Sequence, residues 1–147
     1  PAMVARIDGA EGFAVHRTYL AADGSGKAQV DPAKAMLGAV AGGAVRLTEG
    51  HDALAVAEGI ETALSLSCGL LCGAVAVWAG LSAAGLSGLH LPARRGKLII
   101  APDGDATGQG AAHHLANRAT ALGWHVSLFP APAGQDWNDV LQSMKGA

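Results

Sequence analysis

The spacing of hydrophobic and polar positions changes near residue 52, and this change divides the chain in two. In residues 1–51, short runs of alternating apolar and polar residues are separated by turn sequences such as Asp-Gly and Gly-Ser-Gly. Alternation with a period of two is typical of half-buried strands, and these turn residues adopt positive φ at little cost. We therefore expect a small antiparallel hairpin or meander. Its strands are expected at residues 3–9, 12–20, 26–31 and 42–50, with a helical turn or loop at 31–38.

From residue 52 onward, apolar runs alternate with helix-like segments. The runs are residues 53–59, 73–80, 96–105 and 124–130; the helical segments are 60–71, 82–89, 107–123 and 136–147. Gly123 is expected to end the third helix, and Asp136 or Asn138 to cap the last. Continuous apolar strands between helices indicate a parallel sheet covered on both faces. The sequence thus predicts an α/β domain over residues 52–147, with about four parallel strands, preceded by an antiparallel β appendage over residues 1–51.

Composition narrows the class of protein. Half of the 147 residues are hydrophobic and 15% are charged, so a packed core can form, and the net charge of −2 gives no global nucleic-acid signature. We find no signal-peptide pattern and no uncharged apolar run of ~18 residues, and therefore expect a cytoplasmic protein without membrane association. Cys68 and Cys72 have no nearby partners for a zinc site and are expected to be small apolar residues near a helix end.

Three carboxylates follow the predicted strands directly. Glu58 ends the first apolar run, and Asp103 and Asp105 end the third, each with glycine close behind. The carboxyl ends of parallel strands meet at one edge of a sheet, so the three side chains are expected to converge. Clustered carboxylates repel one another unless a cation or a hydrogen-bond network compensates. Together they predict a divalent-metal site for phosphoryl transfer.

Other interpretations of the sequence Asp-Gly-Asp-Ala-Thr-Gly are weaker. It can be a turn in which Asp105 caps the following helix. An EF-hand loop would need glutamate at its twelfth position, where His114 stands. A haloacid-dehalogenase-like phosphatase would need a downstream lysine and acidic pair, and only Lys145 follows. The Gly-Ser-Gly-Lys sequence near residue 25 lacks the spacing of a P-loop.

The residues around both acidic motifs resemble the Toprim domain of primases, topoisomerases and OLD-family nucleases. "AEGIETALS" is similar to the glutamate-glycine motif after its first strand, and "PDGDATGQGAA" to its D-x-D-x-x-G-x-x-A motif after the third. The segments "WAGLSAAGL" and "GQDWNDVL" look most like phage- and plasmid-type primases. The resemblance implies a Rossmann-like Toprim fold and Mg²⁺ or Mn²⁺ as cofactor, with Glu58 as ligand or general acid/base and Asp103 and Asp105 as metal ligands.

Accessory groups follow from the same resemblance. Many primases carry an aspartate where Thr62 stands, and neighbouring Glu61 is a candidate substitute. Asp136 and Asp139 offer another acidic group or helix capping, and Ser82 is expected to line the site. Candidate nucleic-acid contacts are Lys27, Lys34 and Arg46. Arg118 shares a helix face with His114 and is expected either to pair inside the protein or to contact phosphate. In contrast, Arg94, Arg95 and Lys97 precede the third strand, at the opposite end of the sheet, and are expected to be solvated. Trp78 and Trp124 are expected to pack in the core.

The sequence therefore favours a magnesium-dependent DNA primase-type nucleotidyltransferase, the Toprim core of a larger DNA-replication protein. Its expected partners are single-stranded DNA and ribonucleoside triphosphates, with a helicase or zinc-binding module in the full-length protein. The alternatives are an OLD-like metal-dependent nuclease and a non-catalytic DNA-binding or assembly module. Intact carboxylates at all three positions argue against the last. The sequence does not decide whether the chain is a primase or a nuclease, or whether it binds one metal ion or two. It also leaves open the template preference and the oligomeric state.

Overall fold

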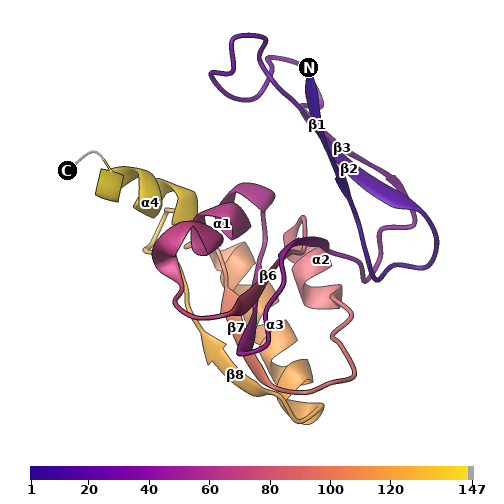
Figure 1. The fold of residues 1–147 in the computed structure, drawn as a ribbon, viewed down its shortest axis with the longest axis vertical. Helices are drawn as coiled ribbons and strands as arrows, with labels where there is room; N and C mark the ends of the chain where they lie inside the picture. The colour runs from indigo at the N-terminus through magenta and orange to yellow at the C-terminus, as the bar shows by residue number, and fades with distance from the viewer. Residues whose placement is uncertain (146–147) are drawn as a thin grey trace.

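The computed structural model describes residues 1–145 and contains two β-sheets. Figure 1 shows a three-stranded sheet, in indigo and purple, projecting from one end of an α/β body that carries all the helices. The predicted parallel-dominated sheet with flanking helices and N-terminal antiparallel strands is confirmed. Within residues 1–145, no helix has both the length and the apolar character needed to cross a bilayer.

The N-terminal sheet consists of β1 (Ala2–Arg6), β2 (Ala14–Tyr19) and β3 (Lys34–Gly38), all antiparallel, in the order β1-β2-β3. The helical turn or loop predicted at residues 31–38 is therefore wrong for residues 34–38, which pair with the free edge of β2, whereas residues 31–33 do lie in a loop. The strand predicted at residues 26–31 is also wrong, since Lys27 forms only an isolated bridge with Leu20. Gly38 ends β3 with φ of 94°, where a Cβ would collide with the carbonyl of Phe13.

The larger sheet has the order β4-β6-β5-β7-β8. Its strands are β4 (Val45–Thr48), β5 (Ala53–Ala57), β6 (Val75–Ala79), β7 (Lys97–Ala101) and β8 (His125–Leu128). The last four are parallel, as predicted, whereas β4 runs antiparallel to β6 and adds a fifth strand at the edge. The strand predicted with the appendage thus belongs to the larger sheet, and a domain division at residue 51 stays a prediction.

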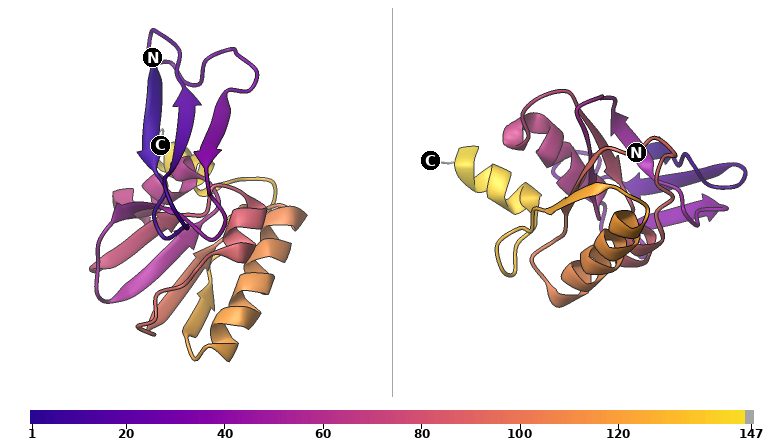
Figure 2. Two further views of the ribbon diagram at one scale, coloured as in Figure 1. Left: turned by 90° about the vertical axis from the view of Figure 1, so that its right-hand side faces the viewer. Right: turned by 90° about the horizontal axis from the view of Figure 1, so that it is seen from below.

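Helices cover both faces of this sheet. They are α1 (Ile60–Ser65), which continues into the π-helical turn η1 (Leu66–Leu70), then α2 (Ala83–Gly88), α3 (Ala106–Ala121) and α4 (Trp137–Lys145). Figure 2, right, shows α1 and α4 on one side and α3 on the other. The alternation along β5 explains these layers: Ala55 and Ala57 pack with α1 and α4, while Leu54 and Val56 pack with α2 and α3.

The helix ends follow the predicted chemistry in part. Gly123 has φ of 87° directly beyond α3, and Asp136 Oδ1 caps α4 by accepting the amide of Asp139 at 2.8 Å. The helix predicted over 136–147 is present to Lys145, and its last two residues lie outside the described residues. Trp78 and Trp124 are buried, as expected. Cys68 and Cys72 lie at the end of η1 but are exposed.

Candidate active site

Glu58 directly follows β5, the central strand of the larger sheet. Because β5 pairs with β6 on one side and β7 on the other, the position of Glu58 is fixed from both sides. The Glu58 carbonyl accepts the Leu81 amide at 2.7 Å, and Leu81 is a non-glycine residue at positive φ, 75°. Burial, then the negative charges of Asp103 and Asp105, raise the pKa of the Glu58 carboxyl, while the Ala83 amide and Lys34 oppose this effect.

Asp103 and Asp105 follow β7, the neighbour of β5, so the structure places them at the same carboxyl edge as Glu58. Asp105 caps α3, its Oδ1 accepting the Gly108 amide at 2.7 Å. Asp103 Oδ1 accepts the hydroxyl of Thr62 at 3.3 Å. Asp105 thus fits the helix-capping interpretation and still presents its carboxylate, which is exposed, at this edge.

The loop before α4 closes over the Asp103–Asp105 turn. The Gly104 amide donates to Gln135 O at 2.8 Å, and the Gly134 amide donates to Gly104 O at 2.9 Å. A Cβ on Gly104 would collide with the carbonyl of Pro132. Only glycine therefore allows the loop to approach the turn this closely.

This approach adds Asp136 and Asp139 to the acidic edge. The two cap each other's amides, with Asp136 N 3.2 Å from Asp139 Oδ2. Together with Asp103 and Asp105 they line an open depression of about 220 Å³. Burial and the charge of Asp136 raise the pKa of Asp103, the Thr62 hydroxyl lowers it, and Asp105 and Asp139 raise it further. The edge thus concentrates negative charge with few compensating groups.

Glu61 has a different environment from the other acids. Its Oε1 lies 3.1 Å from the Nζ atoms of both Lys27 and Lys34, and Lys34 Nζ is also 3.1 Å from Oε2. Burial would raise the pKa of Glu61, but hydrogen bonds from its own backbone amide, Lys34 and Lys27 lower it to about 2. Glu61 also raises the pKa of Lys27. The two lysines therefore join the N-terminal segment to α1, next to the acidic edge.

The remaining candidate residues make contacts within the protein. The Arg118 guanidinium donates to Ser87 O at 2.9 Å and Leu89 O at 2.6 Å, which holds the end of α2. The Arg46 guanidinium carbon lies 4.4 Å from the centroid of the Trp78 ring. Ser82 caps α2 by accepting the Gly85 amide at 3.0 Å. None of these contacts tests a role in binding substrate.

Sequence reasoning missed two features of this site. The first is the hydrogen bond from Thr62 to Asp103, although the position of Thr62, one helical turn after Glu58, indicated that it faces the acidic edge. The second is the double lysine contact to Glu61, for which the sequence carries no signal because 27 and 34 residues separate the partners.

The carboxylate oxygens at this edge are the kind of ligand that a hard divalent cation prefers, but they are not already arranged as a complete binding site. Among residues 1–145, no three His, Cys, Asp or Glu side chains are arranged as a ready-made metal site. Mg²⁺, however, is commonly held by one or two carboxylates, with waters and substrate phosphates completing its shell. Burial raises the pKa values of Glu58 and Asp103, and the charges of neighbouring aspartates raise them further; a bound cation would offset this repulsion between carboxylates.

Comparison with known proteins agrees with the fold. The model of the family described as "Toprim domain" matches residues 53–147, and that of a "Domain of unknown function (DUF7146)" matches residues 1–47. No curated protein matches. The structure is similar to a crystal structure of a DNA primase domain from Pseudomonas aeruginosa, with a TM-score of 0.52 and 18% identity over 88% of this chain and 42% of that one.

At 18% identity this likeness shows the fold alone, and this chain spans less than half the length of its structural neighbour. The family match is more extensive, since it covers well over half of this chain and includes both acidic motifs. The chain belongs to the Toprim domain family.

Proposed function

We propose that this chain is the catalytic core of a primase-type nucleotidyltransferase, which joins ribonucleotides on single-stranded DNA. Toprim domains generally bind divalent metal ions, and we propose Mg²⁺ or Mn²⁺ here. The observation that carries the proposal is the acidic edge: Glu58, Asp103 and Asp105 follow adjacent parallel strands, and burial together with the neighbouring carboxylates raises the pKa of Glu58 and of Asp103. Such an edge is suited to a reaction that accumulates negative charge on phosphate oxygens.

The proposed roles follow from the environment of each carboxylate. Asp103 and Asp105 would hold the ion, which when bound neutralises charge on the reacting phosphates. Glu58 is half-buried and its pKa is raised, so it suits the acceptance of a proton from an attacking hydroxyl. Asp136 and Asp139 lie beside Asp103 and are the candidate accessory acids.

The ion pairs of Glu61 with Lys27 and Lys34 suggest a route by which nucleic acid approaches the acidic edge, because both cations lie beside it. Lys27 and Lys34 come from the N-terminal segment and contact Glu61 at 3.1 Å, and Lys34 acts on the pKa of Glu58. We propose that this segment supplies phosphate contacts to the template, and that the domain division falls at residue 51, with β4 as a strand that the N-terminal unit adds to the edge of the larger sheet. A helicase or zinc-binding module in the full-length protein would supply movement or template selection.

The proposal is tested with four proteins: wild type, Asp103→Asn, Glu58→Gln and the control Asp23→Asn. Asp23 is an exposed carboxylate in a turn, and among residues 1–145 only Ser25 donates hydrogen bonds to it. Each is titrated with Mg²⁺ and Mn²⁺ by calorimetry and assayed for labelled oligoribonucleotide on single-stranded DNA. We expect wild type and Asp23→Asn to bind metal and make product, Asp103→Asn to lose both, and Glu58→Gln to lose at least product formation.

Two results would contradict this function. DNA that becomes shorter, with no oligoribonucleotide formed, would identify a Toprim nuclease instead. A folded wild-type protein that binds neither ion in the presence of template and nucleotide would exclude both reactions and leave a binding or assembly module.

A further inference from the structure

A pocket of about 210 Å³ lies at the opposite edge of the larger sheet from the acidic residues. It is formed where β5, β6 and β7 begin, so its lining includes Leu54 near the start of β5 and Lys97 at the start of β7. A five-residue strand spans about 16 Å, and this length separates the pocket from Glu58 and Asp103. The pocket is therefore a separate site and takes no part in the chemistry proposed above.

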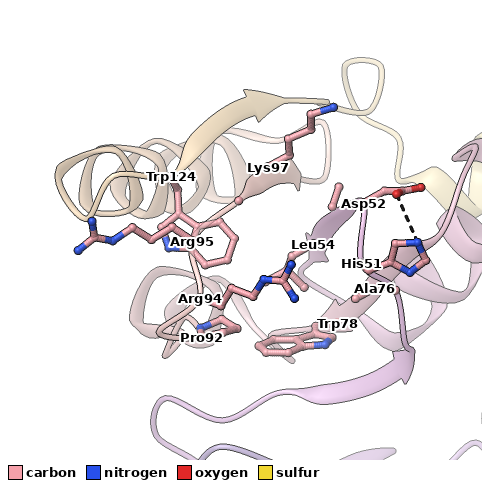
Figure 3. A pocket seen from close by; sticks show the side chains of 13 residues that line it. His51, Asp52, Leu54, Ala76, Trp78, Pro92, Arg94, Arg95, Lys97 and Trp124 are labelled. Atoms are coloured by element: carbon pink, nitrogen blue, oxygen red, sulfur yellow. Dashed lines mark ion pairs between the residues drawn. The ribbon is translucent and has the colours of Figure 1, made fainter.

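The rim of this pocket is positively charged. Arg94, Arg95 and Lys97 line it and are exposed, and within residues 1–145 none of them pairs with a carboxylate. Figure 3 shows the Arg94 guanidinium extending across the pocket toward Leu54, with Arg95 and Lys97 at the margin. These are the cations that the sequence placed in solvent at the far end of the sheet, and the structure groups them around one cavity.

The one acidic residue in the lining is already engaged. Asp52 Oδ1 lies 3.6 Å from His51 Nε2, the pair joined by the dashed line in Figure 3, and Asp52 Oδ2 accepts the Ala74 amide at 2.9 Å. The site therefore carries excess positive charge in a chain whose net charge is −2. An anion is the ligand that this charge favours.

The floor of the pocket is apolar and aromatic. Trp78 and Trp124 both line it, each less than a tenth exposed, together with Leu54. The Arg46 guanidinium carbon lies 4.4 Å from the centroid of the Trp78 ring and covers one face of that indole, and Trp124 lies on the other side of the pocket in Figure 3. The cavity of about 210 Å³ is open at the surface, so it has room for one planar ring while the rest of a longer ligand lies outside it.

We propose that this pocket binds one nucleotide unit, with the base packed against Trp124 and Leu54 and phosphates bound by Arg94, Arg95 and Lys97. A base with its phosphate combines the flat apolar surface and the negative charge that the floor and the rim require. Aromatic rings beside arginine are a recurrent means of holding single-stranded nucleic acid. One phosphate does not occupy all three cations, and the remaining ones can contact the neighbouring phosphates of a strand. A single strand is therefore expected to bind more tightly than a free mononucleotide.

The test is done in EDTA, so that it is independent of metal and of the acidic edge. A labelled deoxythymidine 15-mer is titrated with wild type, with Arg94→Gln/Lys97→Gln, and with the control Asn117→Asp/Gln142→Glu, which lowers the net charge by the same two units. Asn117 and Gln142 are exposed on α3 and α4, outside the pocket and outside the N-terminal segment. We expect the pocket variant to bind about tenfold more weakly and its salt dependence to fall by ~1.4 in log K against log salt, which is the loss of two phosphate contacts.

A second measurement tests the place of the base. Deoxythymidine monophosphate and the 15-mer are each expected to quench tryptophan emission, the 15-mer at lower concentration. Trp124→Phe should remove most of this quenching, whereas Trp137→Phe, which alters a ring stacked on Phe129 outside the pocket, should keep it. Circular dichroism establishes that each variant is folded.

Three results would overturn the proposal. Equal weakening by the pocket and control variants would show non-specific electrostatic attraction. Inorganic phosphate competing as well as the mononucleotide would show that the base is not recognised. Absence of binding by folded wild type at low salt would show that the pocket has no nucleotide ligand.

Discussion

Replacing Glu61 with glutamine is expected to destabilise the protein at neutral pH and to have little effect in acid. Glu61 accepts contacts from Lys27 and Lys34 at 3.1 Å, and its pKa is about 2, against an ordinary value of 4.5. Without screening, this separation corresponds to roughly 3.4 kcal/mol. The side chains of Glu61, Lys27 and Lys34 are 34%, 51% and 39% exposed, so each ion pair contributes at most ~1 kcal/mol. We therefore expect a loss of about 1–2 kcal/mol.

The sign of the pH dependence follows from the lowered pKa. A carboxylate whose folded-state pKa lies below its unfolded value stabilises the fold fully above the unfolded value, here about 4.5. That stabilisation disappears as the pH falls toward 2. The difference between wild type and Glu61→Gln should therefore be largest at pH 7 and shrink steadily below pH 4.5.

Urea denaturation at several pH values between 7 and 2.5 measures this difference. It is followed by both circular dichroism and tryptophan emission, so that coincident curves establish a two-state transition. Glu11→Gln serves as the control, because Glu11 is exposed and forms no ion pair among the described residues. A difference that stays constant from pH 7 to 2.5, or that is no larger than for Glu11→Gln, would refute the reasoning.

Three further substitutions test other contacts. Asp103→Asn should raise the Tm by about 2–5 °C at pH 7.5 in EDTA. The pKa of Asp103 is raised in the folded state, so its negative charge destabilises the fold at pH values above the ordinary pKa of an aspartate. Calorimetric scans at pH 7.5 and 3.5 should therefore show the gain only at the higher pH. Gly104→Ala should cost about 1–3 kcal/mol in urea denaturation, because the new methyl group meets the Pro132 carbonyl; an unchanged midpoint would contradict the close approach of that loop. Arg118→Met should cost about 2 kcal/mol in the same assay by removing charged hydrogen bonds to Ser87 and Leu89, and a change below 0.5 kcal/mol, roughly that of an exposed surface substitution, would contradict it.

The parallel core could be predicted because its signals are local. Residues 53–57, 75–79 and 98–101 are short apolar runs that are largely buried, and each is followed by a segment with helical spacing. The ends of such runs also identify the edge where Glu58, Asp103 and Asp105 lie. Pattern and topology rule together were sufficient to bring these three residues to one edge.

Features of the structure that depend on partners distant in the sequence could not be predicted from local sequence patterns. The partner of β4 is β6, about thirty residues away, and nothing within Val45–Thr48 distinguishes that partner from the nearby N-terminal strands. Residues 31–38 contain residues common in both turns and strands, and only the free edge of β2 decides between them. The same limit hid the contact between Glu61 and its two lysines.

Because β5 lies at the centre of the larger sheet, the residues of the acidic edge differ in local stability. Amides of β5 are flanked by strands on both sides, so they should exchange with solvent hydrogen only when the whole domain unfolds. Asp136 and Asp139 lie at the start of α4, which belongs to neither sheet and is held by side-chain packing and by the loop before it, so its amides are expected to exchange by local opening. Glu58 is therefore expected to keep its position for as long as the domain stays folded, while Asp136 and Asp139 move away and return with each such opening.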